Sequence, residues 1–440
     1  MQEKGLLQAL NFQDLVIYGM VFMLPIAPFS LFGIVQNASH GLVPLAYLLG
    51  AIVMAFTARS YGLLSAEIPL AGSVYTYTRL GINETVGFIA GWLIFLDYMI
   101  APGLMYAISS ASLHELLPMI DRWQWIVAFT ILGTGMNIAG IGFAAKANKA
   151  MLYAMLLVLA IFMGVGLTAL YHGKGNGSLT MGSLFDSHRF AWPAMGTAIL
   201  ISSTNFLGFD AITTLAEEVR PEKRHLLRWA GLLTLAIIVV LFVMQSWIVA
   251  DLAPGVKAGG DDTAFYDIAY YAGGRFLRVL TTTSVALSFG IACAVVCQSA
   301  IARILFAMGR DRQMPSVFAR LHPVTRQPYV ANLFIGAVSL LLALAFRDDI
   351  EALVLFQNFG ALSCFCLVNV AVVGYFWVKK GERHPISHIV MPTIGLVITL
   401  LLLLAMRRQT LELGGAWLIA GGVYFCVLRF VLHRSTAIET

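Results

Sequence analysis

Long apolar runs limit what this chain can fold into more than any other feature of its sequence. A helix needs about 20 predominantly apolar residues to cross the hydrocarbon core of a bilayer. Windows of that length predict twelve spans, at residues 14–36, 42–65, 85–113, 123–141, 149–170, 193–218, 226–251, 276–308, 328–346, 350–378, 386–406 and 413–433. Of all residues, 59% are hydrophobic and 12% are charged, whereas a soluble domain has about 45–50% apolar and 25% charged residues. The sequence therefore predicts an all-α integral membrane protein with twelve transmembrane helices.

The connections between these spans differ in their positive charge. If the N-terminus is inside the cell, the external loops hold roughly half as many Lys and Arg residues as the cytoplasmic segments. The positive-inside rule then places both termini in the cytoplasm. No cleavable signal pattern precedes the first span, so we expect a multi-pass protein of the cell inner membrane. The basic connection 308–328 is expected to form a short amphipathic helix around 315–320, and the external connection 251–267 is acidic.

Two of the spans contain residues that interrupt a helix. Span one contains Gly19 and Pro25, and span six contains Gly208 beside Asp210. Pro removes a backbone hydrogen bond, and Gly weakens a helix by roughly 1 kcal/mol relative to Ala. Two inverted repeats of five helices, each opening with a broken helix, would separate the interrupted spans by five. The predicted parts are a cytoplasmic N-terminal segment at 1–13, a first repeat at 14–170, a second repeat at 193–378, two final spans at 386–433 and a cytoplasmic tail at 434–440.

Charged residues inside the apolar spans indicate where a ligand could bind. Asp97 and Asp210 lie well inside spans three and six, and a charge at membrane depth is expensive unless it faces a cavity or a partner. Arg59 is the one cation found inside a span, about two turns from Glu67, and we expect it to snorkel or to pair there.

Cysteine and polar patterns argue against other classes of protein. The five cysteines all lie in apolar segments, and an odd number inside spans argues against a disulfide framework. Cys293 and Cys297 share a helix face, but no His or carboxylate lies nearby, so we expect no metal site. No nucleophile–base set is visible, so an enzyme is not expected. No basic run with interleaved aromatics suggests a nucleic-acid partner, and no cofactor is expected.

Three runs of sequence resemble signatures of the amino acid–polyamine–organocation (APC) transporters. They are AEIPLAGSVYTYTRLGINETVGFIAGW, NFLGFDAITTLAEEVRPEKR and ARILFAMGRDRQMPSVFARLHP. Within that superfamily, the runs LDYMIAP, FLGFD and NFGALSCFCLVN are most similar to bacterial putrescine importers. The resemblance implies a five-plus-five inverted-repeat (LeuT-like) fold, with substrate between spans one, three, six, eight and ten. Some relatives carry a proton-coupling Lys in span five; residues 151–170 hold no Lys, so coupling through such a residue is not expected.

A putrescine site needs two separated groups of acceptors and an apolar sleeve between them, because the molecule has an ammonium at each end. Asp97 and Asp210 would supply the anions, and carbonyls freed at the helix breaks would accept further hydrogen bonds. Aromatic rings would add cation–π contacts of about 0.5–2 kcal/mol each, although such rings more often pack a helix bundle. The predicted substrate-binding residues are Asp97, Tyr98, Asp210, Gly19, Phe22, Phe206, Leu207, Phe209, Asn205, Ser202, Ser203, Gln298, Asn358, Phe359 and Ser363.

Coupling and gating rest on a second set of polar residues. Glu217 and Glu218 are candidates for an inner gate, although pairing with neighbouring cations is the alternative. A proton on Asp210 is the first candidate for the coupling ion by analogy with the family, and Na⁺ near Ser284 and Ser288 is the second.

Two functions remain open from the sequence. The first is a secondary active transporter that imports a polyamine by alternating access. The second is an amino acid permease of the same superfamily, in which the substrate carboxylate would bind free N–H groups at the break. The expected partners are a small cationic substrate and the lipid bilayer, and a homo-oligomer is compatible with the sequence.

Overall fold

The fold is described from a computed structural model, which describes residues 11–70, 73–139, 144–257, 259–261, 263–310, 314–325 and 327–427. Within these ranges the protein is helical, and no strand is present. The helices are α1 (Phe12–Met23), α2 (Pro28–Ala38), α3 (Val43–Glu67), α4 (Ser73–Gly81), α5 (Glu84–Leu116), α6 (Arg122–Ala139), α7 (Ala144–Tyr171), α8 (Met181–Leu184), α9 (Trp192–Ser203), α10 (Leu227–Leu252), α11 (Ala264–Leu287), α12 (Ala294–Arg310), α13 (Tyr329–Ala345), α14 (Ile350–Val372), α15 (Met391–Leu404) and α16 (Arg408–Cys426). The predicted tail, 434–440, lies outside the described residues.

Many of these helices are long and apolar enough to cross a membrane. By length and composition, seven helices in the described ranges qualify, and α1 with α2 makes an eighth if this bent pair is one span. The fold is therefore that of a multi-span membrane protein. Helices occupy all twelve predicted segments, but α13 falls just short of a full span at 17 residues.

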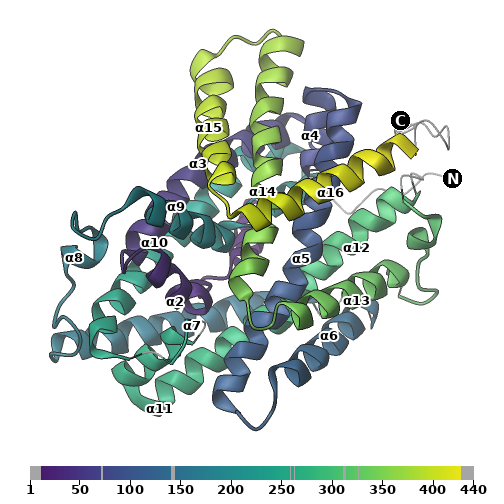
Figure 1. The fold of residues 1–440 in the computed structure, drawn as a ribbon. Helices are drawn as coiled ribbons and strands as arrows, with labels where there is room; N and C mark the ends of the chain where they lie inside the picture. The colour runs from purple at the N-terminus through teal and green to yellow at the C-terminus, as the bar shows by residue number, and fades with distance from the viewer. Residues whose placement is uncertain are drawn as a thin grey trace.

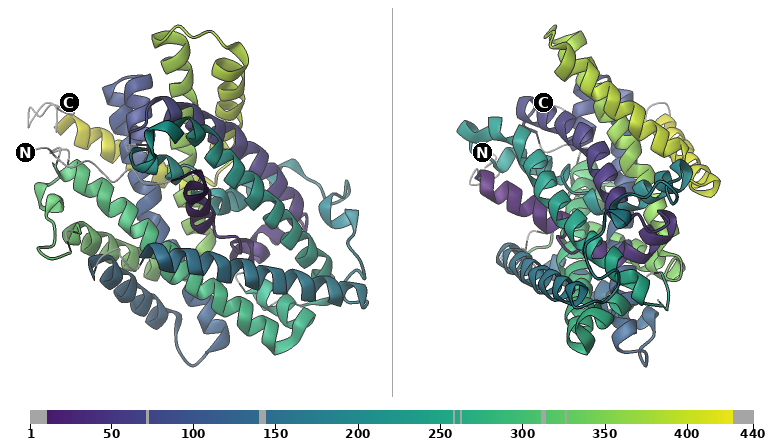
Figure 2. Two further views of the ribbon diagram at one scale, coloured as in Figure 1. Left: turned by 180° about the vertical axis from the view of Figure 1, so that it is seen from behind. Right: turned by 90° about the vertical axis from the view of Figure 1, so that its left-hand side faces the viewer.

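Two groups of helices surround the centre of the molecule. In one group, α10 packs against α1, α2 and α3, while α9 packs against α2 and α3. In the other group, α5, α6, α12 and α13 all pack against one another. Seen from behind in Figure 2, the purple α1 and α2 lie near the middle of the molecule, between teal and green helices. In Figure 1, α15 and the end of α14 extend at the edge of the molecule.

Span one is broken where α1 ends, at Met23. Leu24 has φ 51°, which a non-glycine residue rarely adopts. Pro25 follows, and its carbonyl accepts a hydrogen bond from Gln245 Nε2 at 2.9 Å, so α10 supplies a partner for the opened backbone. The helix resumes at Pro28, and α2 is bent by 56° relative to α1. The prediction of an interruption is confirmed.

The position of this break differs from the prediction at one residue. Gly19 lies inside α1 rather than at the break, so the expectation of freed carbonyls around Gly19 was wrong. A Cβ added there would lie 2.6 Å from Ile212 Cδ1 and 2.9 Å from Thr234 Cγ2. Gly19 therefore lets α1 pack closely against the second half of span six and against α10. The backbone at Gly19 itself stays helical.

Span six is also broken, as predicted. α9 ends at Ser203, a 3₁₀ turn covers Thr204–Phe206, and Leu207 is extended with φ −62° and ψ 134°. Gly208 follows with φ 128°, a conformation that glycine adopts without the steric cost of a Cβ. A 3₁₀ stretch then covers Ala211–Glu218.

Two predictions about the connections were wrong, and one helix was not predicted. α11 begins at Ala264, so Asp267 lies in its first turn, and Asp251 is a buried residue of α10 rather than part of an acidic loop. The predicted amphipathic helix around 315–320 is a single 3₁₀ turn, Ser316–Ala319. The sequence did not predict α4, because its nine residues are too few and too polar for an apolar window.

Candidate functional site

The two helix breaks meet at the centre of the molecule. A Cβ added at Gly208 would lie 2.5 Å from Phe22 Cδ1 and 3.1 Å from Phe22 Cβ. The broken backbone of span six therefore lies directly against the last turn of α1. Glycine is required here both by its positive φ and by the lack of space.

Asp210 connects this junction to α5. Its side chain is 4% exposed. Oδ1 accepts a hydrogen bond from the Gly208 N–H at 3.1 Å, and Oδ2 accepts one from the Tyr98 hydroxyl at 3.2 Å. The ring of Tyr98 lies edge-on to that of Phe22, with centroids 6.3 Å apart. Phe22, Tyr98 and Asp210, all predicted from the sequence, are therefore brought together.

Asp97 is the residue before Tyr98 and contacts a different helix. It is 6% exposed, and its Oδ1 accepts a hydrogen bond from Gln357 Nε2 of α14 at 3.0 Å. Gly360 allows α14 to approach, because a Cβ at that position would lie 3.0 Å from the Asp97 nitrogen. One turn of α5 thus directs a carboxylate toward α14 and a phenol toward the break of span six.

Gln357 was not predicted as a site residue. It is buried, and its Oε1 has no hydrogen-bond partner. The signal that could have identified it is the polar pair Gln357–Asn358 inside an otherwise apolar span, of which only Asn358 was selected. A buried amide oxygen without a partner beside a carboxylate can accept hydrogen bonds from a bound cation.

Neither Asp97 nor Asp210 forms a salt bridge in the part of the chain that the structure describes. Their partners are an amide, a phenol and a backbone N–H. A buried carboxylate is strongly destabilising unless it is paired and hydrogen-bonded. The arrangement can therefore stabilise a positively charged ligand, which would supply the missing opposite charge.

A small cavity lies between the breaks. Its volume is about 30 Å³, which is enough for roughly one water molecule. It is lined by Phe22, Met23, Leu24, Ala27, Leu31, Ala101, Leu104, Met105, Ile108, Thr204, Asn205, Leu207, Phe289, Cys293, Cys297 and Gln357. Most of this lining is apolar. Gln357, which donates to Asp97, is part of it, whereas Asp97, Tyr98 and Asp210 themselves are not. This volume is smaller than a diamine, so the cavity in this conformation does not have room for one.

Several predicted polar residues form hydrogen bonds with neighbouring helices around the break of span six, so their donors are already used. Asn205 lines the cavity, but its Nδ2 donates to the Tyr47 hydroxyl at 2.7 Å. Ser202 donates to the Ala46 carbonyl at 3.2 Å. Asn358 Nδ2 donates to the Leu200 carbonyl at 2.7 Å and to Thr204 Oγ1 at 2.8 Å. These bonds hold the end of α9 against α3 and α14.

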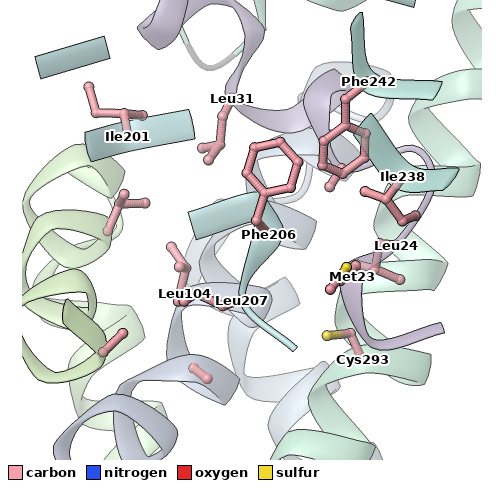
Figure 3. Close-up of a cluster of buried hydrophobic side chains, with 14 of the residues drawn as sticks. Met23, Leu24, Leu31, Leu104, Ile201, Phe206, Leu207, Ile238, Phe242 and Cys293 are labelled. Carbon is pink, nitrogen blue, oxygen red and sulfur yellow. The ribbon is translucent and has the colours of Figure 1, made fainter. Parts of the chain in front are cut away.

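Of the five predicted aromatic residues, only Phe22 lines the cavity. Tyr98 lies beside it, against Phe22 and Asp210, and the other three lie elsewhere. Figure 3 shows the ring of Phe206 turned toward Phe242, with centroids 5.2 Å apart. Phe209 packs against Phe365, with centroids 5.3 Å apart, and Phe359 lies against Gly414. These rings pack the bundle, which was the alternative considered for them.

Other candidates lie in separate surroundings. Gln298 accepts a hydrogen bond from the Tyr106 hydroxyl at 3.0 Å and donates to Thr134 Oγ1 at 2.9 Å, so it belongs to a polar cluster between α5, α6 and α12. Ser288 is buried at the start of a π-helical turn, and its Oγ has no partner. The remaining candidates are Ser203, which is buried with an unpartnered Oγ, and Ser284 and Ser363, which are half-buried. The side chains of Glu217 and Glu218 lie outside the described part of the structure.

The predicted surroundings of Arg59 need correction. Arg59 Nη2 donates to Ser387 Oγ at 2.9 Å, and Glu67 instead pairs with Lys380. Span eleven packs on α3 and thus supplies the partner of Arg59, which spacing along one helix could not reveal.

Several transporters are similar in sequence to this chain over most of its length. The chain is 30% identical over 432 residues to the low-affinity putrescine importer PlaP of Escherichia coli, covering 96% of this chain and 94% of that protein. It is 26% identical over 452 residues to the branched-chain amino acid permease BcaP of Bacillus subtilis, covering 96% and 93%. A methylthioribose transporter of Bacillus subtilis is 24% identical over 402 residues, covering 87% and 83%.

A family profile extends over nearly the whole sequence. The profile described as "Amino acid permease" matches residues 15–428, which include both helix breaks and both buried carboxylates. The relatives above are transporters, so an enzyme is not indicated. The chain therefore belongs to the amino acid permease (APC) family of membrane transporters.

Proposed function

We propose that this protein is a secondary active transporter that imports a putrescine-like diamine by alternating access. The observation that carries the proposal is the pair of buried carboxylates, Asp97 and Asp210, beside two meeting helix breaks and without a salt bridge in the described chain. A diamine brings two positive charges to such a site, and each carboxylate would stabilise one of them.

The apolar wall of the cavity suits the rest of the substrate. Leu24, Leu104 and Leu207 line it, and a four-carbon chain between two ammonium groups gains free energy from apolar contact, at roughly 0.8 kcal/mol per buried CH₂. The rings of Phe22 and Tyr98 pack edge-on to each other beside Asp210, and either could add cation–π attraction to a bound ammonium, which is stronger when water is excluded. The putrescine importer among the relatives supports this choice of substrate class.

The pattern of helix contacts supports a five-plus-five inverted repeat with twelve spans. If spans one to five and six to ten are equivalent, each contact should have a counterpart five spans along. The contact of span three with span nine (α5 with α13) is matched by that of span eight with span four (α12 with α6). The contact of span one with span seven (α1 with α10) is matched by that of span six with span two (α9 with α3). The contact of span three with span ten (α5 with α14) is matched by that of span eight with span five (α11 with α7).

Alternating access would widen the cavity and open it first to one side of the membrane and then to the other. Movement of the group that contains α1, α2, α3, α9 and α10 against the group of α5, α6, α12 and α13 would expose it. In this proposal both termini are cytoplasmic, and Glu217 and Glu218 form the inner gate. A membrane potential that is negative inside favours entry of a dication by roughly 2.3 kcal/mol per charge per 100 mV.

Asp210 is the residue we propose for proton coupling. A proton on its carboxyl group would replace the substrate's charge after release and allow an empty carrier to return. Na⁺ binding near Ser284 and Ser288 is the alternative, and the unpartnered Oγ of Ser288 is an acceptor suited to it.

A second candidate substrate is an apolar amino acid. The branched-chain amino acid permease among the relatives favours it, as does a cavity lined by Leu31, Leu104 and Ile108. In that case only the amine would need a carboxylate, and one of the two acids would be dispensable.

Uptake in proteoliposomes separates these two functions. Labelled putrescine uptake by the wild-type protein should be reduced by unlabelled diamines and not by leucine. Asp97→Asn and Asp210→Asn should each reduce it at least tenfold, since either change removes a charge that faces an ammonium. Putrescine uptake that survives both changes would exclude the diamine site, and leucine uptake that needs only one of the acids would establish the amino acid alternative.

A further inference from the structure

One cation within the membrane-spanning part of the protein, Arg59, has no anionic partner among the residues that the structure describes. Arg59, in the second half of α3, is half-buried. Its Nη2 donates to Ser387 Oγ, and its Nε is buried without a partner. In the described ranges it forms no salt bridge, because Glu67, the nearest carboxylate along α3, pairs with Lys380. A guanidinium has five N–H donors, so most of its capacity for hydrogen bonding is unused.

Arg59 lies on a face of α3 that points away from the core. Ile52, two helical turns earlier on the same face, is 48% exposed. α15 packs beside this face through Gly395, where an added Cβ would lie 3.1 Å from Phe56 Cβ. Figure 1 shows α15 at the outer edge of the molecule. Arg59 therefore lies in the seam between two helices that face lipid.

The contact with Ser387 indicates how deep in the membrane Arg59 lies. The helix that continues into α15 begins at Ile386, so Ser387 lies in its first turn. Because Arg59 contacts Ser387, the guanidinium lies where the chain enters the hydrocarbon region. This is the level of the lipid headgroups.

The surroundings at that level are basic. Lys379, Lys380 and Arg383 lie at and just after the end of span ten, close in sequence to Ser387. Glu67 and Glu382 both pair with Lys380, and the Glu67 carboxylate raises the pKa of Lys380. Together with Arg59, these residues give four cations and two acids, so the net charge is +2.

We propose that Arg59 and Ser387 form a binding site for the phosphate group of an anionic phospholipid, seated in the seam between α3 and α15. Phosphate oxygens match the fork of a guanidinium and form charge-assisted hydrogen bonds with it. The N–H groups of the first turn of a helix favour the same negative charge. The basic residues nearby attract acidic lipids to this leaflet. The acyl chains would then lie along the exposed apolar side chains of α15.

The test uses the full-length purified protein in nanodiscs. Thermal unfolding is measured in phosphatidylcholine alone and after part of it is replaced by phosphatidylglycerol. We expect the acidic lipid to raise the Tm of the wild-type protein by several degrees. Arg59→Gln should lose most of that increase. Arg407→Gln is the matched control, because Arg407 lies just past the other end of α15 and is paired with Glu351 at 2.6 Å. This variant should keep the increase.

Two further measurements keep the outcome decisive. Native mass spectrometry of the wild-type protein should show at least one phosphatidylglycerol retained in preference to phosphatidylcholine, which does not depend on any variant folding. Inorganic phosphate added to phosphatidylcholine discs should not raise the Tm; an equal increase would assign the site to the free ion and overturn the lipid. An Arg59→Gln protein stabilised by phosphatidylglycerol as much as the wild type would also overturn the proposal.

Discussion

The hydroxyl of Tyr98 donates a hydrogen bond to Oδ2 of Asp210 at 3.2 Å, and this bond connects α5 to the broken backbone of span six. Both groups are buried. Because Asp97 precedes Tyr98, the same turn of α5 also holds the second carboxylate against α14. Movement of the break relative to α5 would change the surroundings of Asp210 directly. It would also act on α14, which holds Asp97, because Asn358 of α14 donates to Leu200 and Thr204 at the break. Binding and conformational change would be coupled in this way.

The first prediction concerns this bond. Tyr98→Phe keeps the ring against Phe22 but removes the donor to Asp210. A hydrogen bond to a charged group contributes about 1.5–3 kcal/mol, and about 1.4 kcal/mol corresponds to a factor of ten. We expect putrescine uptake at low substrate concentration to fall by at least tenfold, measured as kcat/KM in proteoliposomes, with normal amounts of folded protein.

Tyr106→Phe is the matched control for this change. Tyr106 is two turns further along α5, and its hydroxyl donates to Gln298, away from the cavity. It should transport at close to the wild-type rate. Equal losses in the two variants would mean that the Tyr98 hydroxyl acts on stability rather than on the site.

The second prediction concerns the junction of the two breaks. Gly208→Ala combines a φ of 128° with a Cβ only 2.5 Å from Phe22 Cδ1, so the break cannot keep its present backbone. We expect the free energy of unfolding to fall by about 2 kcal/mol or more, as overpacking and backbone strain together would cause. We also expect no measurable uptake. Gly196→Ala, in α9, has nothing within 4 Å of the added Cβ and should behave like the wild type in both assays.

Much of the fold could be predicted from the sequence, because bilayer thickness sets the length of each apolar run. Helices were therefore found close to the predicted positions, and Pro25 and Gly208 correctly marked the two broken spans. Connections were less predictable. The start of α11 was missed because Ala264–Gly273 mixes polar and apolar residues, and the kink at Gly273–Gly274 separates it from the apolar window.

The candidate site was predictable in part, for a physical reason. A carboxylate in an apolar span is expensive wherever it points, so Asp97 and Asp210 could be selected without coordinates. Aromatic side chains carry no such penalty, and the spacing of apolar residues along one helix does not reveal which neighbouring helix a ring faces. Phe206 and Phe22 were therefore indistinguishable in the sequence, although the first packs against Phe242 and the second lines the cavity.

The third prediction tests the residue that sequence reasoning missed. Gln357→Leu preserves the approximate size of the side chain but removes the donor to Asp97 and the unpartnered Oε1. We expect the KM for putrescine to rise by about tenfold, consistent with about 1.5 kcal/mol for one hydrogen bond to a charged group, while kcat changes less. Gln124→Leu, at an exposed position outside the site, is the control. An unchanged KM in Gln357→Leu would remove Gln357 from the site.

The fourth prediction concerns a buried carboxylate far from the cavity. Asp251, at the end of α10, is fully buried and accepts four hydrogen bonds from one connection. Its donors are Asn176 Nδ2 at 2.7 Å, Thr180 Oγ1 at 2.6 Å, the Thr180 N–H at 2.9 Å and Ser183 Oγ at 2.6 Å. The carboxylate therefore holds the connection between α7 and α9 onto the end of α10.

Asp251→Ala removes every one of these acceptors at once and leaves the donors buried. Each unsatisfied donor costs about 1–3 kcal/mol, part of which the connection recovers by moving into water. We expect a lower Tm and faster cleavage between α7 and α9 by a protease added to that side of the membrane. Asp261→Ala, at an exposed position after α10, should change neither. If the connection stays as resistant in Asp251→Ala as in the wild type, its position is determined by its own side-chain packing and not by the carboxylate.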